Sequence, residues 1–230
     1  MNIKAILMIL AALINLLFGL YIISLNKKNK NNIYYGLWCV VVSFWIFGNS
    51  LVQIVNNADF FNNIVVKFIY IPALLIPLTF LYFAYHFPYP NVTLFKTIKY
   101  SVIIPLILEF LTLFGTLNFE KIEIINGKAN EIIILSDFII LTIYFVSYIL
   151  FSFIILFSKY QQATGIFKNQ LRFIIYGTLS TFIFGSFFSL FLPLFNNFYF
   201  DWFGTLFVVL NIVIVGYFVF IKSQPRNLEI

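Results

Sequence analysis

Apolar residues occur in seven long runs that follow one another along the whole chain. A helix needs about 20 residues to cross the hydrocarbon core of a bilayer, and in lipid it satisfies its own backbone hydrogen bonds. The pattern therefore predicts an all-α, polytopic membrane protein, a seven-transmembrane helix bundle over residues 1–221 with a short cytoplasmic tail at 222–230. The expected spans are about 3–25, 33–56, 64–87, 97–117, 137–158, 170–192 and 202–221.

The segment between the fourth and fifth runs, about 118–136, has a different pattern. Residues 121–124 alternate polar with apolar, Asn126-Gly127 is typical of a two-residue β-turn, and residues 128–134 provide a return strand. We therefore expect a small β-hairpin that caps the outer mouth of the bundle.

Composition places the chain in the membrane class. Hydrophobic residues make up 62% of the 230 residues and charged residues only 10%, whereas soluble domains are about 25% charged. The net charge of +6 could suggest nucleic acid, but the basic residues form short clusters between apolar runs. We expect the lipid bilayer, with its anionic surface, to be their partner, and no nucleic acid. The single cysteine, Cys39, excludes an intramolecular disulfide.

Lysine and arginine are unevenly distributed between the two sides of the predicted bundle. Because short cytoplasmic loops are enriched in these residues, the distribution predicts an outside N-terminus and a cytoplasmic C-terminus in a multi-pass protein of the cell membrane. The predicted cytoplasmic side carries 10 of them: Lys27, Lys28, Lys30, Lys96, Lys99, Lys159, Lys168, Arg172, Lys222 and Arg226. The other side carries Lys4, Lys67, Lys121 and Lys128.

Glu109 is the one ionisable residue deep within a predicted span. It shares a stripe of the fourth helix with Ser101, Pro105, Thr112 and Thr116. A carboxyl in the membrane is expensive and is a candidate for function, with a protonated, hydrogen-bonded structural glutamic acid as an equal alternative. Pro105 withholds the donor for the Ser101 carbonyl, so we expect a kink or a bound water there.

Other polar residues fall at a depth similar to that of Glu109. At a rise of about 1.5 Å per residue, they lie within about one helical turn of it. They predict a polar chamber beneath the outer mouth that binds a small molecule or lipid, with scattered interhelical hydrogen bonds as the alternative. The candidate ligand-binding residues are Glu109, Asn49, Gln53, Tyr144, Ser147 and Asn211.

Small residues spaced four apart form a ridge on the sixth run. Such a ridge allows two helix backbones to approach closely. We expect it to serve internal packing, with contact to a homodimer partner as the alternative. The ridge residues are Gly177, Thr181, Gly185 and Ser189.

Sequence motifs of soluble-type catalysis are missing. There is no HExxH, no GxSxG and no phosphate-binding glycine loop, and the last run has no lysine to hold retinal as a Schiff base. His86 is the only histidine and ends the third run. We therefore predict no catalytic residue, no metal site and no cofactor.

The order and spacing of several elements resemble the N-terminal seven-transmembrane sensor region of membrane-bound bacterial and archaeal histidine kinases. The resemblance covers nearly the whole chain. It is carried by Tyr70-Ile71-Pro72 through Pro77 to Phe83-Ala84-Tyr85 and Phe87-Pro88, by Lys168 to Arg172 with Gly177, by Pro193, and by Gly204 through Gly216 to Lys222.

The resemblance implies a non-enzymatic, sensory input module for signal transduction in a two-component system. In that family the last helix leads into a cytoplasmic kinase, which residues 222–230 are too few to form. We expect either a truncated sensor or one that acts through a separate kinase or another output protein. The alternatives are a small transporter or channel subunit with Glu109 as a proton or ion relay, and a membrane scaffold subunit.

Overall fold

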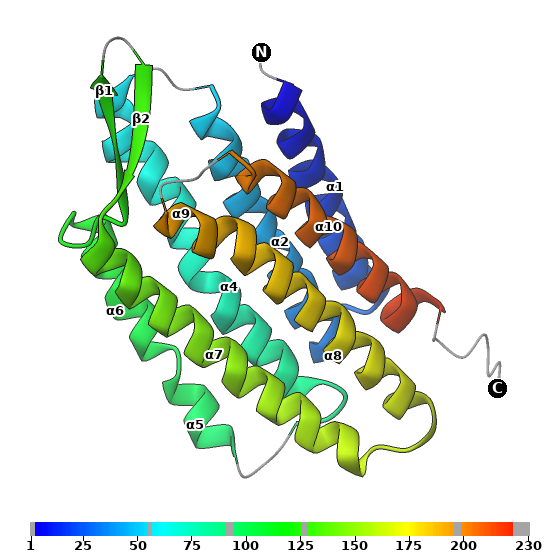
Figure 1. Cartoon of the computed structure of the whole chain (residues 1–230). Coiled ribbons are helices and arrows are strands. Elements are labelled where there is room, and N and C mark those ends of the chain that lie inside the picture. Colours follow the sequence, from blue (N-terminus) through cyan, green and yellow to red (C-terminus); the bar gives the residue numbers. More distant parts are fainter. Residues whose placement is uncertain (1–2, 55–56, 91–93, 126–127, 196–198, 223–230) are drawn as a thin grey trace.

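Long helices lying side by side make up most of the structure, a computed structural model that describes residues 3–54, 57–90, 94–125, 128–195 and 199–222 (Figure 1). The all-α bundle predicted from the apolar runs is thereby confirmed. The longer helices are α1 (Ile3–Leu25), α2 (Lys30–Val52), α4 (Val66–His86), α6 (Ile103–Leu113), α7 (Leu135–Gln162), α8 (Gly165–Ser186) and α10 (Asp201–Gly216). The shorter elements are α3 (Ala58–Phe60), α5 (Phe95–Tyr100), α9 (Leu192–Leu194) and the π-helical turns η1 (Phe61–Val65), η3 (Phe187–Phe191) and η4 (Tyr217–Lys222).

Six of the described helical segments are long and apolar enough to cross a membrane. A seventh crossing is divided between α5 and α6, which together run from the lower end of α4 up to the hairpin (Figure 1). The chain is thus a multi-pass membrane protein. The start of α1 and the end of η4 lie at opposite ends of the bundle, as an odd number of crossings requires.

The surface around the bundle is apolar, as a lipid environment demands. Large apolar side chains are exposed on several helices, among them Leu17, Leu106, Ile154 and Leu210. Such a continuous apolar surface would be unfavourable in water. In a bilayer, by contrast, acyl chains cover it.

The predicted fourth span is interrupted between α5 and α6, one turn before Pro105. Pro105 has no N–H to offer the carbonyl of Ser101. The Tyr148 hydroxyl of α7 donates a hydrogen bond to that carbonyl instead, at 2.5 Å. The expected kink is therefore present, and it joins this span to α7.

The lower end of α4 is fixed by a buried lysine of α7. Lys159 is 4% exposed, and its Nζ donates to the carbonyls of Ala84, Tyr85 and Phe87 at 2.9, 2.5 and 2.8 Å. The last carbonyls of a helix lack intrahelical donors and carry the negative end of its dipole. One ammonium group thus satisfies three carbonyls and holds α4 against α7.

Several helices extend beyond their predicted spans. α7 continues to Gln162 rather than ending near 158, and α8 begins at Gly165 rather than near 170. Hydropathy marks the apolar segment only, whereas a helix can continue through polar residues at the membrane surface. Of the predicted tail at 222–230, only Lys222 belongs to the described residues.

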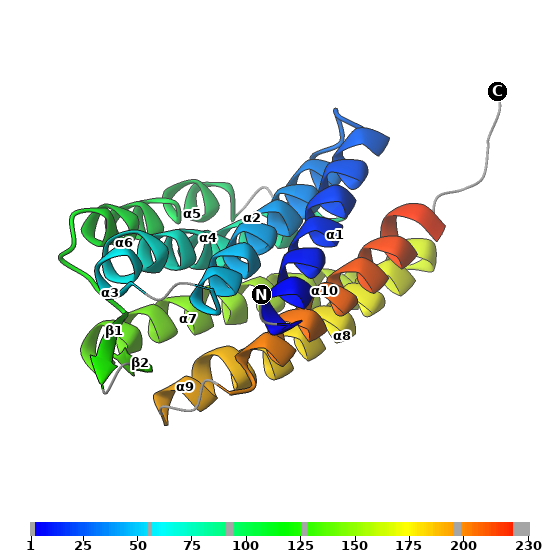
Figure 2. The same ribbon diagram turned by 90° about the horizontal axis from the view of Figure 1, so that it is seen from above.

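The buried side chains form two clusters that α4 joins. The first cluster lies mainly between α1, α2, α8 and α10, around Tyr35 and Trp38. The second lies between α4, α7 and the hairpin, around Phe119 and Phe138. Seen from above, α5, α6 and the hairpin lie on one side of the bundle, and α1 and α10 lie on the other (Figure 2).

The hairpin expected between the fourth and fifth spans is confirmed. β1 (Glu120–Ile125) pairs antiparallel with β2 (Lys128–Ile133), in a register from Glu120 opposite Ile133 to Ile125 opposite Lys128. The expected turn at Asn126-Gly127 lies outside the described residues.

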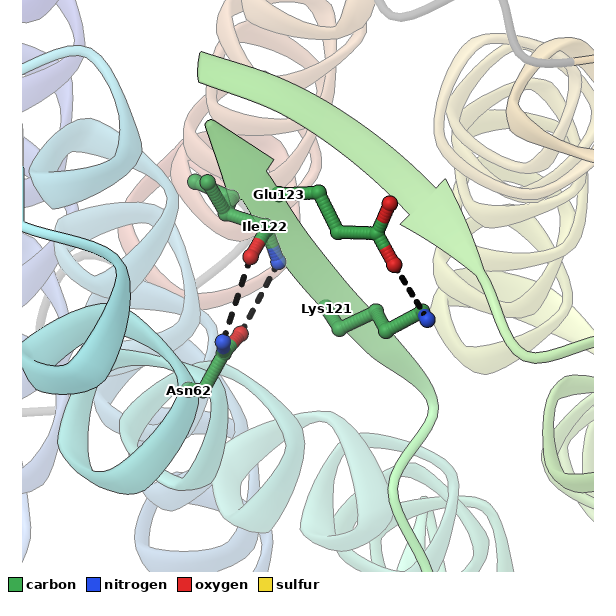
Figure 3. A network of polar contacts seen from close by, with 4 residues as sticks. All are labelled: Asn62, Lys121, Ile122 and Glu123. Carbon is green, nitrogen blue, oxygen red and sulfur yellow. Dashed lines mark hydrogen bonds and ion pairs between the residues drawn. The ribbon is translucent and has the colours of Figure 1, made fainter. Parts of the chain in front are cut away.

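Asn62 of η1 fixes the free edge of β1 to the bundle (Figure 3). Its Nδ2 donates to the Ile122 carbonyl at 3.2 Å, and its Oδ1 accepts from the Ile122 N–H at 2.8 Å. An unpaired strand edge would otherwise expose both groups. On the same strand, Lys121 and Glu123 form an exposed ion pair of 2.5 Å.

The predicted ridge of small residues faces α10. A Cβ added to Gly177 would overlap Val215 Cγ2, and one added to Gly185 would lie 2.9 Å from Val208 Cγ2. Thr181 is buried, and its hydroxyl donates to the Gly177 carbonyl at 2.9 Å. The structure thus places the ridge inside the bundle, between α8 and α10.

We expect Gly177→Ala to lower the free energy of unfolding by about 1–3 kcal/mol, because the added methyl group overfills the contact with Val215. Thermal unfolding of the detergent-solubilised protein measures this loss. The double variant Gly177→Ala/Val215→Ala should recover part of it, and the lipid-facing control Leu179→Ala should lose much less. A midpoint for Gly177→Ala equal to that of the wild type would contradict the packing.

Candidate functional site

A cavity of about 110 Å³ lies inside the bundle, below the hairpin. Its walls come from α2, α4, α7, α8 with η3 and α9, and α10. Glu120 of β1 and Ile133 of β2 close it on the hairpin side. Since its lining belongs to both clusters of buried side chains, the cavity lies where the two halves of the bundle meet.

Aromatic rings form much of the cavity wall. They come from four different helices, so no single sequence motif contains them. Trp38 lies in α2, where its ring packs 5.1 Å from the ring of Phe80. The aromatic residues that line the cavity are Trp38, Trp45, Tyr70, Phe138, Phe145 and Phe182.

Two carboxyl groups share this cavity. Glu120 is only 8% exposed, and the Tyr70 hydroxyl donates to its Oε2 at 2.7 Å. Asp201, the first residue of α10, lines the cavity with Ser189 beside it. Among the described lining residues there is no lysine, arginine or histidine. The cavity is therefore acidic and lacks a built-in counterion.

The pKa of Glu120 is raised from its ordinary value of 4.5 to about 7. Burial is the main cause because it disfavours the charged form, and the nearby Asp201 carboxyl adds to the effect. The hydrogen bond from Tyr70 opposes the shift by stabilising the anion. Glu120 is thus placed to exchange its proton near neutral pH.

The other charged groups that the structure describes near β1 are paired elsewhere or exposed. Lys121 pairs with Glu123, Lys67 of α4 donates to the Leu113 carbonyl at 2.9 Å, and Asp137 of α7 accepts from the Asn118 N–H at 2.9 Å. Asp59 of α3 is exposed at the surface. Within the described part of the chain, Tyr70 and Asp201 are therefore the polar groups that act on Glu120.

Two buried N–H donors in the lining have no hydrogen-bond partner in the described part of the chain. They are Asn49 Nδ2 and Trp38 Nε1, on side chains that are 9% and 1% exposed. Buried polar groups nearly always find a partner, so each exception needs an explanation. Both unpaired donors thus belong to residues of the cavity wall.

The structure brings only part of the predicted chamber together. Asn49 and Gln53 line the cavity, as do Thr181, Gly185 and Ser189, which we expected only to pack helices. Ligand binding by Asn49 and Gln53 stays a prediction.

The other four predicted residues do not line the cavity. Tyr144 donates to the Leu74 carbonyl at 2.7 Å, Asn211 donates to the Phe207 carbonyl one turn earlier at 3.1 Å, and Ser147 is exposed on the outer surface. Glu109 is half-buried on α6, and its Oε1 has no partner among the described residues. The structure therefore does not bring these four residues into the cavity with Asn49 and Gln53, because depth along a helix does not fix the direction a side chain faces.

Glu120, Asp201, Trp38 and Tyr70 are site residues that the sequence analysis missed. Both acids lie at the outer ends of apolar runs. A charged residue at such a position is normally exposed in a loop, so neither acid stood out as a candidate. The burial of Glu120 could have been inferred from β1, because side chains alternate along a strand and Glu120 therefore shares a face with the buried Ile122. No comparable signal marks Asp201.

Comparison with protein-family models and with curated proteins finds no match for this chain. The resemblance to sensor regions of histidine kinases therefore stays a prediction. The described residues also contain no group of three or more His, Cys, Asp or Glu that could hold a metal ion. The site has to be interpreted from its own chemistry.

We expect the folded protein to lose stability as the pH rises from about 4.5 to about 7. The folded state holds the Glu120 proton more tightly than the unfolded state does, so its stabilisation is complete below 4.5 and lost as the pH passes the raised pKa. The loss is at most about 1.4 kcal/mol per pH unit. Thermal unfolding of the wild type and of Glu120→Gln, which cannot ionise, measures it.

The exposed Glu123 provides the matched control. Glu123→Gln should keep the wild-type dependence on pH, whereas Glu120→Gln should weaken it. If the two variants show the same slope as the wild type between pH 4.5 and pH 7, Glu120 does not titrate as described.

Proposed function

We propose that this chain is a non-enzymatic signal-input module of the cell membrane, in which a small molecule bound in the cavity changes the packing of the helices. The supporting observation is the cavity itself, which lies where two halves of the bundle meet and whose lining residues carry two buried donors without partners in the described part of the chain. A ligand that completes these hydrogen bonds in one arrangement of the helices, but not in another, shifts the population toward the first.

The element best placed to carry such a change is α10 with η4. Asp201 lines the cavity, and Lys222 ends the same continuous segment of 22 residues. At about 1.5 Å per residue, the segment connects two points roughly 33 Å apart. π-helical turns are common at functional sites, and one of them, η3, lies in the cavity wall while another, η4, ends this segment.

The basic residues support an external position for the cavity. The loops and helix ends opposite the hairpin contain Lys27, Lys28, Lys30, Lys96, Lys99, Lys159, Lys168, Arg172 and Lys222. This end is therefore assigned to the cytoplasm. An output protein, such as the separate kinase implied by the resemblance, would bind there.

The alternatives have less support. Transport through Glu109 would require a polar path, but Glu109 does not line the cavity. A scaffold that contacts its partner through the ridge would need that ridge to be accessible, but Gly177 and Gly185 face Val215 and Val208.

We expect the metabolite fraction of a cell extract to shift the distance between two spin labels at the lower end, one on each half of the bundle. Lys28→Cys and Lys99→Cys, in a Cys39→Ala background in nanodiscs, provide exposed positions for them. Asn49→Leu should abolish the shift because it removes an unpaired donor from the cavity.

Asn211→Leu is the matched control, since Asn211 is an asparagine within a span that lies outside the cavity. This variant should respond like the wild type. An unchanged distance in the wild type, or an equal response in Asn49→Leu, would contradict the proposed function.

A further inference from the structure

We infer that the cavity binds a small organic cation that also carries a hydrogen-bond acceptor, such as an amino alcohol. This inference rests on the proposed function, because it names the class of ligand for the same site. It follows from three independent properties of the lining, namely its charge, its aromatic walls and its unpaired donors.

The charge of the lining favours a cation. Glu120 and Asp201 both face the cavity, and the described lining contains no basic side chain. Buried carboxylates are costly unless a positive charge accompanies them. An anionic ligand would add a third negative group, so the lining discriminates against it.

The aromatic walls favour an organic cation over a metal ion. Rings of Trp38, Trp45 and Tyr70 lie in the same lining as the two carboxyls. The face of an aromatic ring attracts an ammonium group, most strongly when water is excluded. A Ca²⁺ or Mg²⁺ ion, in contrast, prefers about six to eight oxygen ligands, which this largely apolar wall does not offer.

The unpaired donors require that the ligand also carries an acceptor. Asn49 Nδ2 and Trp38 Nε1 are unpaired donors on residues that line the cavity, and as donors neither can bind an ammonium group. A hydroxyl or carbonyl oxygen on the ligand satisfies them. A purely apolar ligand would leave both donors without partners and both carboxyls without a counterion.

The cavity volume sets the size of the ligand. The space of about 110 Å³ holds roughly seven to eleven water-sized groups, at about 10–15 Å³ for each. A small amine with one or two polar substituents fits this volume, whereas a lipid does not. The ligand class is therefore a compact amine.

Binding of the cation should compete with the proton on Glu120. The pKa of this carboxyl is about 7, so below neutral pH the ligand has to displace a proton. Among the described residues, the groups that face Glu120 are Tyr70 of α4, whose hydroxyl donates to it, and Asp201 of α10. The affinity should fall by up to about tenfold for each pH unit below the pKa.

The test compares choline with 3,3-dimethylbutan-1-ol, which has the same shape and hydroxyl but no charge, and with tetramethylammonium, which has the charge but no acceptor. Ethanolamine and 3-aminopropan-1-ol extend the series to primary amines. Calorimetry on the full chain in nanodiscs measures each dissociation constant at pH 6 and pH 8. We expect an amino alcohol to bind at least tenfold more tightly than the neutral alcohol and tetramethylammonium, and more tightly at pH 8.

Glu120→Gln and Asp201→Asn should each weaken this binding at least tenfold, whereas Asp59→Asn, on the exposed outer surface, should not change it. If either cavity variant fails to fold, the comparison of ligands on the wild type still decides the question. Equal binding of charged and neutral probes would overturn the inference.

The outcomes separate this inference from the proposed function. If the metabolite fraction shifts the spin-label distance but no amine binds, the module senses a ligand of another class and the inference is wrong. If neither the fraction nor any amine has an effect, both are wrong.

Discussion

The structure depends on one constraint: in hydrocarbon, each polar group that leaves the helical hydrogen-bond pattern must find a partner within the protein. The chain meets this demand with single side chains at the places where its regular structure stops. Tyr148 binds the carbonyl that Pro105 leaves free, Lys159 binds the last carbonyls of α4, and Asn62 binds the edge of β1. These contacts also connect the spans to one another.

In the wall of the cavity, some buried polar groups find no partner within the described part of the protein. Two buried donors, Asn49 Nδ2 and Trp38 Nε1, lack a partner among the described residues, and both belong to residues that line the cavity. The same cavity contains a carboxyl whose pKa burial raises to about 7. Unpaired donors and a buried carboxyl thus meet at the junction of the two clusters, where a bound molecule could most readily affect both halves of the bundle.

The sequence predicts elements in this chain much better than it predicts which side chains meet. Runs of apolar residues identify spans, Asn-Gly between alternating residues identifies the hairpin, and Pro105 identifies the kink, because each depends on local chemistry. The facing direction of a span is harder to predict, since lipid and protein interior are both apolar. Ser147 and Asn211 show this, because their depth is similar to that of Asn49 but their side chains do not reach the cavity.

The two carboxyls of the site show a second limit. Glu120 and Asp201 lie where spans begin or hairpins start, and a charge at such a position is ordinarily solvated. Only the return of the hairpin over the bundle buries Glu120, and that return depends on contacts such as the one between Asn62 and Ile122. Long-range contacts of this kind leave no periodic pattern in the sequence.

The claim on which the account rests is that the hairpin and its cavity face the outside, while the turn between α7 and α8 faces the cytoplasm. Single cysteines at Glu123→Cys and Thr164→Cys, both exposed and in a Cys39→Ala background, can be treated with a membrane-impermeant maleimide on intact cells. The account predicts labelling of the first before lysis and of the second only after lysis. The reverse pattern, or labelling of both on intact cells, would contradict it.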